Sequence, residues 1–405
     1  MQSDHQISSA RKRRLWRNFH LFLMQKQTIE QEDIESVMNA LKEDAITRGP
    51  PVKAFEEAIA NDCNVRYAVA FTNGTAALMA AYFAAELQPY DYVISSPNTF
   101  IATVGIPLQQ KLQIHFTDID RETGNLDLSQ IKKMSSIQLS RGRFIIVPVH
   151  FSGLAVDMQA LDYLICQPNA VVIEDAAHAI GSFYPSGEKV GSCVYSNMTI
   201  FSFHPTKTIT TGEGGMVTTN DPGLYHRLLL FRDNGIEREN PYLLNAQMPG
   251  YYEVHAITGN FNVTSLQGAL GLSQLKRLKA FVEKRRLLIQ HYRQALKEFL
   301  HLKLFTDSQD DITAFHLFVI QIDFEAYQTT RESVMEKLKQ QGIGTQVHYI
   351  PLYRHPIFKS RNQDWQNLFP NMEAYYKQTL TLPLYPELTT KDIDRICEIL
   401  KSILK

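Results

Sequence analysis

The sequence has few cysteines and no hydrophobic run long enough to cross a bilayer. Its four cysteines are scattered along 405 residues, with no Cys-x-x-Cys pair and no histidine spacing that would suit zinc. We therefore expect no metal site, and a reduced, cytoplasmic setting for the chain.

Charge of neither sign predominates. The chain has 41 lysines and arginines against 42 aspartates and glutamates, which gives a formal net charge of −1. A protein that attracts nucleic acid through its overall field carries a clear positive excess. The balance argues against a nucleic-acid partner and favours small-molecule chemistry.

The first residues differ from the rest of the chain. Residues 11–27 contain the run RKRR and a short apolar stretch, LWRNFHLFLM, which Arg17, Asn18 and His20 interrupt. The stretch is too short to span a bilayer, and no small-residue cleavage site for a signal peptide follows it. We predict that residues 1–26 are a disordered leader outside the fold; a membrane-surface or partner-binding helix is the alternative.

The remaining length, with 44% hydrophobic residues, is enough for one large core and a smaller domain. Short apolar runs alternate with helical patterns such as GTAALMAAYFAAEL, as in a mostly parallel sheet whose strands are buried on both faces. An α/β domain is therefore predicted over residues 27–275. Its strands are expected at YAVAFT (67–72), DYVISS (91–96), LQIHFTDI (112–119), FIIVPVHF (144–151), AVVIED (170–175) and MTIFSF (198–203).

The last third of the sequence predicts a smaller α+β domain over residues 276–405. Residues 266–300 have apolar positions at helical spacing and no proline, which predicts one long connecting helix. A strand is expected over 313–323, and helices are expected over 332–341 and 392–404.

Two candidate contacts follow the first two predicted strands. Asn73-Gly74-Thr75 precedes an alanine-rich helix, whose first N–H groups could hold a phosphate; a merely tight turn is the alternative. Phe100, in SSPNTFIAT, could stack on a flat heteroaromatic ring, although core packing is the commoner fate of a phenylalanine.

Acidic residues end the strand AVVIED. A carboxylate at the edge of a dry core needs a partner, and a protonated pyridine nitrogen is one for Asp175, which follows Glu174. A helix cap for AAHAIG is the structural alternative. His178 is close enough to share the site, or else it is a packing histidine.

FSFHPTK, residues 201–207, places Ser202 and Lys207 where another apolar strand ends. Desolvation and a nearby cation would lower the pKa of Lys207 and give the free amine that an aldehyde requires; an ordinary loop lysine is the alternative. Ser202 could donate to a phosphate or bond only to the backbone. Together these strand-end groups indicate a pocket for pyridoxal 5'-phosphate.

The motifs then become recognisable. Across residues 27–400 the chain resembles the DegT/StrS sugar aminotransferases of fold type I, in LKEDAITRGPPVKAFEEAIA, FTNGTAAL, PNTFIAT, VPVHFSGLAVDM, VIEDAAHAIGS, FSFHPTKTITTGEGG, LQGALGLSQLKRL, VHYIPLY and LPLYPELT. The resemblance implies the fold type I architecture, with Lys207 as the Schiff-base lysine and Asp175 beside the pyridine nitrogen. It also implies His178 beside the ring hydroxyl, Phe100 on the ring face, and Gly74, Thr75 and Ser202 around the phosphate.

The resemblance extends to the partner subunit and the substrate. Asn260 matches an asparagine that members of the family supply to the phosphate from the neighbouring subunit, which implies a homodimer with shared active sites. Asn262 departs from the pattern, because the family usually has arginine there. His348 and Tyr349 are candidate sugar contacts, although a strand at this position could equally serve packing.

Within the family, FSFHPTK, the YYEV segment and ALGLSQL look most like the aminotransferases of pseudaminic acid synthesis. Those enzymes aminate C4 of a UDP-linked 4-keto-6-deoxy-N-acetylhexosamine. We therefore expect a ping-pong transamination with L-glutamate as donor, in which Lys207 moves the proton. The alternatives are another dTDP- or GDP-linked 3- or 4-ketosugar as substrate, or a non-catalytic relative that serves regulation.

Overall fold

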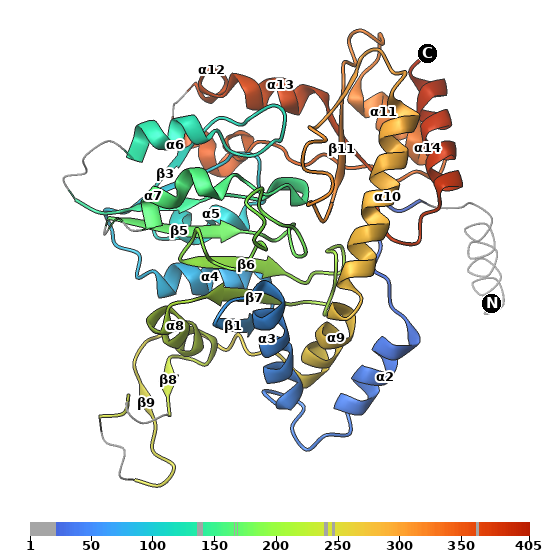
Figure 1. Cartoon of the computed structure of the whole chain (residues 1–405). Helices are drawn as coiled ribbons and strands as arrows, with labels where there is room; N and C mark the ends of the chain where they lie inside the picture. The colour runs from blue at the N-terminus through green and yellow to red at the C-terminus, as the bar shows by residue number, and fades with distance from the viewer. Residues whose placement is uncertain are drawn as a thin grey trace, which may run out of the picture.

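The computed structural model describes residues 22–135, 141–165, 167, 169–238, 242–244, 248–361 and 364–405. A seven-stranded sheet forms its centre, in the order β1-β7-β6-β5-β4-β2-β3 (Figure 1). Only β7 runs antiparallel to its neighbours in this sheet, which confirms the predicted α/β class with a mostly parallel sheet. The strands are β1 Tyr67–Phe71, β2 Tyr92–Ser95, β3 Gln113–Phe116, β4 Phe144–Val147, β5 Ala170–Asp175, β6 Met198–Ser202 and β7 Gly215–Thr219.

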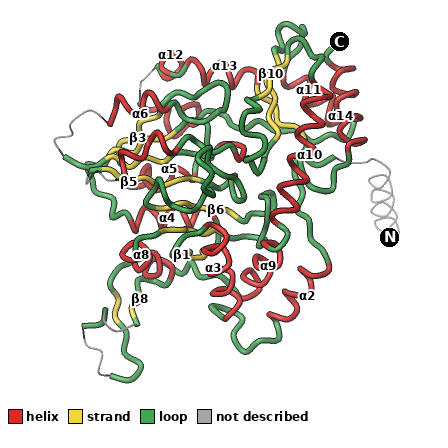
Figure 2. The backbone as a smooth tube through the Cα atoms, viewed as in Figure 1, coloured by secondary structure: helices red, strands yellow, loops and turns green. Residues whose placement is uncertain are grey.

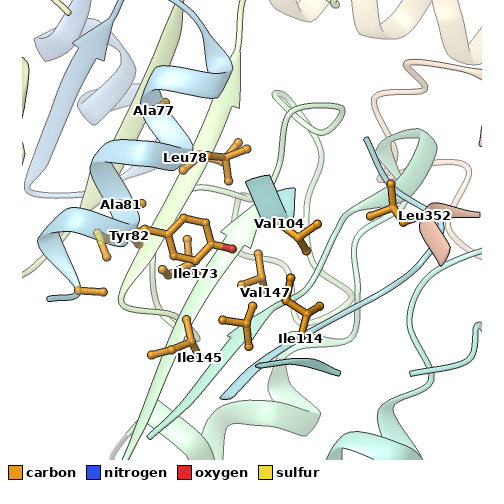
Figure 3. Close-up of a cluster of buried hydrophobic side chains, with 14 of the residues drawn as sticks. Ala77, Leu78, Ala81, Tyr82, Val104, Ile114, Ile145, Val147, Ile173 and Leu352 are labelled. Atoms are coloured by element: carbon orange, nitrogen blue, oxygen red, sulfur yellow. The ribbon is translucent and has the colours of Figure 1, made fainter. Parts of the chain in front are cut away.

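Helices cover both faces of this sheet (Figure 2). Side chains alternate along each strand, so Val69 and Phe71 pack on one face and Ala68 and Ala70 on the other. The first face is covered by α4 Gly74–Ala84, α5 Ala102–Gln109 and α8 Pro222–Arg232. Figure 3 shows its centre, where Ala77, Leu78, Ala81 and Tyr82 of α4 lie over Ile145, Val147 and Ile173. The second face is covered by α3 Pro50–Cys63, α7 Asp162–Ile165 and the start of α10 Leu278–Leu296.

A second core lies in the C-terminal part of the chain. A three-stranded antiparallel sheet, in the order β10-β11-β12, packs against three helices. These elements are β10 Leu302–Leu304, β11 Phe318–Ile322, β12 Thr379–Leu382, α10 Leu278–Leu296, α11 Arg331–Gln340 and α14 Thr390–Ile403. The remaining elements are α2 Gln31–Ala40, α6 Leu128–Ser135, α9 Ser265–Leu275, α12 Trp365–Leu368, α13 Pro370–Gln378, and a projecting hairpin of β8 Ile236–Glu237 and β9 Glu253–Val254.

The structure corrects two expectations near the second core. The predicted single helix over 266–300 is wrong, because α9 ends at Leu275 and α10 begins at Leu278. Arg277 lies between them with φ −103° and ψ 0°, and its guanidinium pairs with Glu30 and Asp33 before and within α2. The strand expected over 313–323 is shorter, because Phe315 has a φ of +48° and β11 starts only at Phe318.

The leader expectation also needs correction. Phe22 is buried and pairs with Ile343, and the Leu384 N–H donates to the Met24 carbonyl. This end of the predicted leader therefore belongs to the fold, while residues 1–21 lie outside the described residues. The division into domains at residue 275 stays a proposal.

Candidate active site

A cavity of about 390 Å³ opens at the carboxyl ends of the central strands. Parallel strands place their ends at one edge of a sheet, so segments that are distant in sequence meet there. The structure brings together every predicted site residue except Asn260 and His348. Those that line the cavity are Gly74, Thr75, Phe100, Asp175, His178, Ser202, Lys207 and Tyr349.

The N-terminus of α4 forms one wall of the cavity. Asn73 caps the helix, and its side chain accepts a hydrogen bond from the Ala76 N–H at 2.8 Å. The N–H groups of Gly74 and Thr75, in the first turn of the helix, have no intrahelical acceptor, and both residues line the cavity. Such a helix N-terminus is suited to bind an anion. A Cβ at Gly74 would lie 2.9 Å from Ser202 Cβ and 3.0 Å from its Oγ. Glycine therefore allows the start of α4 to approach Ser202 at the end of β6, so that two candidate phosphate contacts lie side by side.

Lys207 follows β6 in a turn that its own N–H closes by donating to the His204 carbonyl at 2.8 Å. Burial lowers the pKa of Lys207 to about 8, although the negative charge of Asp175 opposes this shift. With such a pKa, roughly a tenth of the amine is uncharged at pH 7, far more than in a solvated lysine. Lys207 is therefore not an ordinary, fully solvated loop lysine.

Asp175 is the last residue of β5 and is 5% exposed. Its Oδ2 accepts from the Thr103 hydroxyl at 2.7 Å, and its Oδ1 accepts from the Ala177 N–H at 3.2 Å. Burial raises the pKa of Asp175, against the effect of these hydrogen bonds and of Lys207. Residues 176–180 form no helix, so the helix-cap alternative is wrong. A buried acid of this kind is stabilised by a cation in the cavity, as a pyridinium would be.

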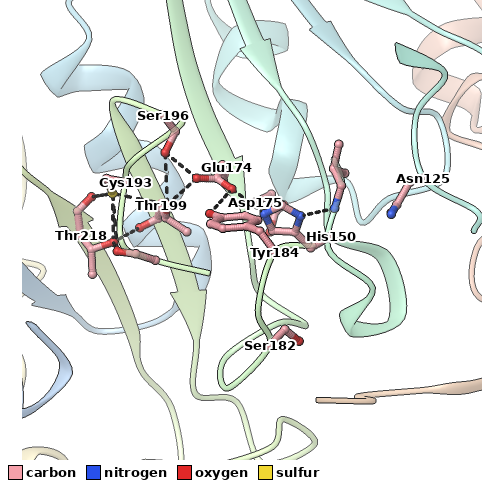
Figure 4. Close-up of polar contacts among 12 residues, drawn as sticks. Asn125, His150, Glu174, Asp175, Ser182, Tyr184, Cys193, Ser196, Thr199 and Thr218 are labelled. Atoms are coloured by element: carbon pink, nitrogen blue, oxygen red, sulfur yellow. Dashed lines mark hydrogen bonds and ion pairs between the residues drawn. The ribbon is translucent and has the colours of Figure 1, made fainter. Parts of the chain in front are cut away.

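Glu174, one residue earlier, has a separate network of partners (Figure 4). His150 Nε2 and the Tyr184 hydroxyl each lie 2.7 Å from Oε2, while Ser196 and Thr199 donate to Oε1 at 2.5 and 2.9 Å. The Val156 N–H donates to His150 Nδ1, so the His150 proton belongs on Nε2, where it faces the carboxylate. All four side chains that donate to Glu174 are buried, and Glu174 itself does not line the cavity.

His178 and Tyr349 form another part of the cavity lining. The Tyr349 hydroxyl lies 3.2 Å from His178 Nε2, and the two rings stack at an interplanar angle of 19°. Tyr349 reaches the cavity because its N–H donates to Asn98 Oδ1 and the Leu352 N–H donates to the Pro97 carbonyl. No strand forms at Tyr349; residues 343–350 make two isolated bridges, Ile343 with Phe22 and Gln346 with Thr381.

Two predicted residues lie away from the cavity lining. His348 Nδ1 lies 2.8 Å from the Thr381 hydroxyl oxygen, and burial lowers the pKa of His348 to about 4. Asn260 is exposed, and its Oδ1 accepts from Asn262 Nδ2 at 2.9 Å. Phe100 lines the cavity and is 59% exposed. Its ring is therefore not packed in the core, which was the alternative.

Sequence reasoning missed several residues of the site. The Thr103 hydroxyl donates to Asp175. The hydroxyl oxygen of a second threonine, Thr99, lies 2.7 Å from that of Thr103. Both belong to the segment that contains Phe100, so the only available signal was their place in that motif. Glu213 and Thr206 also line the cavity, after β6.

Comparison with known proteins decides the family. The model of the DegT/DnrJ/EryC1/StrS aminotransferase family matches residues 27–401. The chain belongs to this family. Spore coat polysaccharide biosynthesis protein SpsC of Bacillus subtilis is 35% identical over 380 residues, which cover 93% of this chain and 95% of that protein.

Two other members are similar over comparable lengths. A Campylobacter jejuni protein named UDP-4-amino-4,6-dideoxy-N-acetyl-beta-L-altrosamine transaminase is 32% identical over 381 residues, 94% of this chain and 96% of that one. The solved structure of Helicobacter pylori PseC, an aminotransferase of pseudaminic acid biosynthesis, matches with a TM-score of 0.83 at 27% identity, over 95% of this chain and 99% of PseC. Membership in this aminotransferase family confirms the predicted fold and the predicted enzyme class.

The described residues contain neither a metal-binding cluster nor a membrane-spanning helix. Among the described residues, no cluster of three or more histidine, cysteine or acidic side chains has the arrangement of a metal site. Within the same residues, no helix has the length and apolar character needed to cross a bilayer.

Proposed function

We propose that the chain is a pyridoxal-phosphate-dependent aminotransferase that transfers an amino group from L-glutamate to C4 of a UDP-linked 4-keto-6-deoxy-N-acetylhexosamine, for surface glycan synthesis. The observation that carries this proposal is a lysine with a pKa of about 8, electrostatically coupled to a buried aspartate, in one cavity with a helix N-terminus. The names of the Campylobacter and Helicobacter relatives support the substrate class.

Each part of the cavity has a role in this proposal. When bound, pyridoxal phosphate supplies an aldehyde and an electron-withdrawing ring. Lys207 would hold the aldehyde covalently and, once displaced by the donor, carry the proton from the donor Cα. Asp175 would face the ring nitrogen and Gly74, Thr75 and Ser202 the phosphate. Phe100 would cover the exposed ring face and His178 would lie beside the ring hydroxyl with its Nε2 facing Tyr349, while Tyr349 and His348 would serve the sugar side.

The proposal includes a homodimer with shared sites. Leu244, between the strands of the projecting hairpin, and Ile257, just after β9, are 91% and 95% exposed. Exposed apolar groups of this kind mark interfaces. Asn260 follows this hairpin, faces outward and lies outside the cavity of its own chain. This outward position is compatible with a contact to a partner's phosphate site. Asn262, which replaces the family's usual arginine, is engaged with Asn260 and with the Asp233 carboxylate.

Complementation tests the shared site. Lys207→Ala and Asn260→Ala are each expected to be inactive or strongly impaired alone. When the two are mixed, unfolded together and refolded, heterodimers contain one site in which Lys207 and the partner's Asn260 are both intact, so activity should return. No return of activity, from protein that sedimentation shows to be dimeric, would contradict the sharing of sites.

A substrate panel tests the reaction. The purified enzyme is incubated with L-glutamate and UDP-, dTDP- or GDP-linked ketosugars, and the amino product is identified by mass spectrometry. The proposal predicts a 4-amino product from the UDP-4-keto-6-deoxy-N-acetylhexosamine. Turnover of dTDP- or GDP-sugars alone would reject this substrate and leave the transaminase class intact.

The cellular site is part of the proposal as well. Cys63, Cys193 and Cys397 are all free and buried, which agrees with a reducing compartment; Cys166 lies outside the described residues. We propose the cytoplasm, where nucleotide sugars would be available. Cell fractionation that recovers the protein outside the cytoplasm would contradict this.

A further inference from the structure

His178 is held at both of its ring nitrogens. The Ser152 N–H donates to Nδ1 at 3.3 Å, and Nε2 lies 3.2 Å from the Tyr349 hydroxyl oxygen. A backbone N–H can only donate, so Nδ1 carries no proton in this arrangement. Burial, and next the charge of Lys207, keep the pKa of His178 well below its usual range, so the ring is neutral at pH 7. Its single proton therefore lies on Nε2.

This tautomer fixes the role of the tyrosine. The His178 Nε2–H donates to the Tyr349 oxygen, and burial raises the pKa of Tyr349, so that the phenol keeps its own proton. That proton must point away from His178. Tyr349 lines the cavity beside Lys207, so its hydroxyl can donate to an oxygen atom placed there.

Ser152 holds this arrangement in an unfavourable backbone conformation. Its φ of 62° and ψ of 0° are left-handed, a conformation that is strained for a non-glycine residue. The residue is 2% exposed, its hydroxyl donates to the Leu317 carbonyl at 2.7 Å, and its carbonyl accepts from the His316 N–H at 2.9 Å. The segment that leads into β11 thus fixes Ser152, and Ser152 directs its N–H at His178.

The other polar groups around His178 leave this assignment unchanged. The His316 ring centroid lies 4.3 Å from that of His178, and burial keeps the pKa of His316 well below its usual range. Gln25 Nε2 contacts the His316 ring and donates to its carbonyl at 3.0 Å. Two cations face this group, Lys207 and, beside the His316 carbonyl, Arg285. The charge of Lys207, and then that of His348, disfavours a second proton on His178.

We propose that Ser152 is a positioning residue, which fixes His178 as the Nε2–H tautomer and thereby makes Tyr349 a hydrogen-bond donor to the carbonyl oxygen of a keto substrate in the cavity. The tautomer and the direction of the Tyr349 proton follow from the structure alone, whereas the keto substrate rests on the proposed function. A donor aimed at an oxygen that becomes more negative during reaction is worth on the order of 10²–10³ in rate.

The tautomer can be measured in cofactor-free protein. Protein with ¹⁵N-labelled histidine would be studied by long-range ¹H–¹⁵N NMR at pH 7, with the His178 signals assigned by their loss in His178→Gln. We expect a protonated Nε2 and an unprotonated Nδ1. A proton on Nδ1, or on both nitrogens, would overturn the inference, and no substrate enters the measurement.

Substitutions at Ser152 separate positioning from stability. Ser152→Ala loses the bond to Leu317 while the left-handed strain remains, so a mixture of His178 tautomers should appear. Ser152→Gly loses the same hydroxyl but adopts this conformation freely, so the Nε2–H form should be largely retained. Ser182→Ala is the matched control, because it removes a buried hydroxyl that donates to the Gly153 carbonyl at 2.7 Å. Identical His178 signals in Ser152→Ala and the wild type would contradict the proposal.

A second pair of variants tests the donor in catalysis. The amide nitrogen of His178→Gln can reach the Nε2 position and donate to Tyr349, whereas the side chain of His178→Asn reaches only the Nδ1 position. The Gln variant should retain kcat within about tenfold, and the Asn variant should lose about 10²-fold or more. Equal losses in both would reject the role of the Nε2 donor. An enzyme that aminated no sugar yet showed the Nε2–H tautomer would reject the proposed function and leave the tautomer assignment standing.

Discussion

Glu174 and Asp175 are consecutive residues of β5 whose carboxylates lie on opposite faces of the central sheet. Glu174 is enclosed by His150, Tyr184 and two hydroxyl groups, whereas Asp175 bonds to Thr103 of α5 and lines the cavity. Alternation along the strand separates them although they adjoin in sequence. One acid stabilises the fold and the other serves the cavity, so substitutions of the two should have different effects.

The first prediction concerns stability. Burial works to raise the pKa of Glu174, but hydrogen bonds from His150, Ser196 and Tyr184 outweigh it and lower the pKa. Glu174→Gln leaves this buried network without its charge and should cost about 3 kcal/mol of unfolding free energy. Urea unfolding of the cofactor-free protein measures it. Glu57→Gln, whose parent side chain is 63% exposed, is the control that should unfold as the wild type does.

The pH dependence of that loss has a definite sign. A carboxyl whose pKa is lower in the folded state stabilises above its unfolded pKa, and this contribution disappears as the pH falls through the folded value. The wild type and Glu174→Gln should therefore converge in stability as the solution is acidified. A gap that stayed constant down to strongly acidic pH would count against an ionised Glu174.

The second prediction concerns the reactivity of Lys207. Only the uncharged amine attacks an aldehyde, so the rate of pyridoxal phosphate attachment should rise with pH and level off above a midpoint near the Lys207 pKa of about 8. Asp175 raises that pKa, so Asp175→Asn should move the midpoint to lower pH. Absorbance changes on mixing give the rates. Asp62→Asn, which removes a carboxylate paired with Lys189, should leave the midpoint in place; an unshifted midpoint in Asp175→Asn would contradict the coupling.

The third prediction concerns the phosphate wall. The added methyl group of Gly74→Ala would crowd Ser202 at 2.9 Å, and overpacking of this kind costs about 1–3 kcal/mol. Relief of this clash would move Ser202 away from the start of α4, and both are proposed phosphate contacts. We therefore expect cofactor affinity to fall by roughly tenfold, which corresponds to about 1.4 kcal/mol. Gly105→Ala, where nothing lies within 4 Å of the new Cβ, is the matched control. Equal affinities for Gly74→Ala and the control, measured by fluorescence titration, would argue against a phosphate at α4.

The sequence alone predicted most strands of the central sheet, and it predicted that the cavity residues lie together. Runs such as AVVIED are apolar at every position except the last two, which marks both a strand buried on two faces and the edge where its polar end emerges. Because parallel strands end at one edge, Gly74, Asp175 and Lys207 could be placed together without any knowledge of contacts. The strand β7 was missed because its GMVTT run is short and follows a glycine-rich turn.

Other features depend on contacts that no local pattern records. The bond from Thr103 to Asp175 joins residues 72 positions apart, and that from Ser152 to Leu317 joins residues 165 apart. The break between α9 and α10 is similar, because apolar spacing continues through Arg277 while its guanidinium reaches residues before and within α2. Apolar periodicity predicts which face of a helix is buried. It does not predict a helix break that depends on contacts with residues distant in sequence.

Covalent trapping tests the central claim most directly. The cofactor-saturated enzyme is reduced with borohydride, digested and mapped by mass spectrometry, with Lys207→Ala treated in parallel. The account predicts one pyridoxyl group per chain, on the peptide that contains Lys207, and none in the variant. A label on any other residue, or no label in saturated wild-type protein, would contradict it.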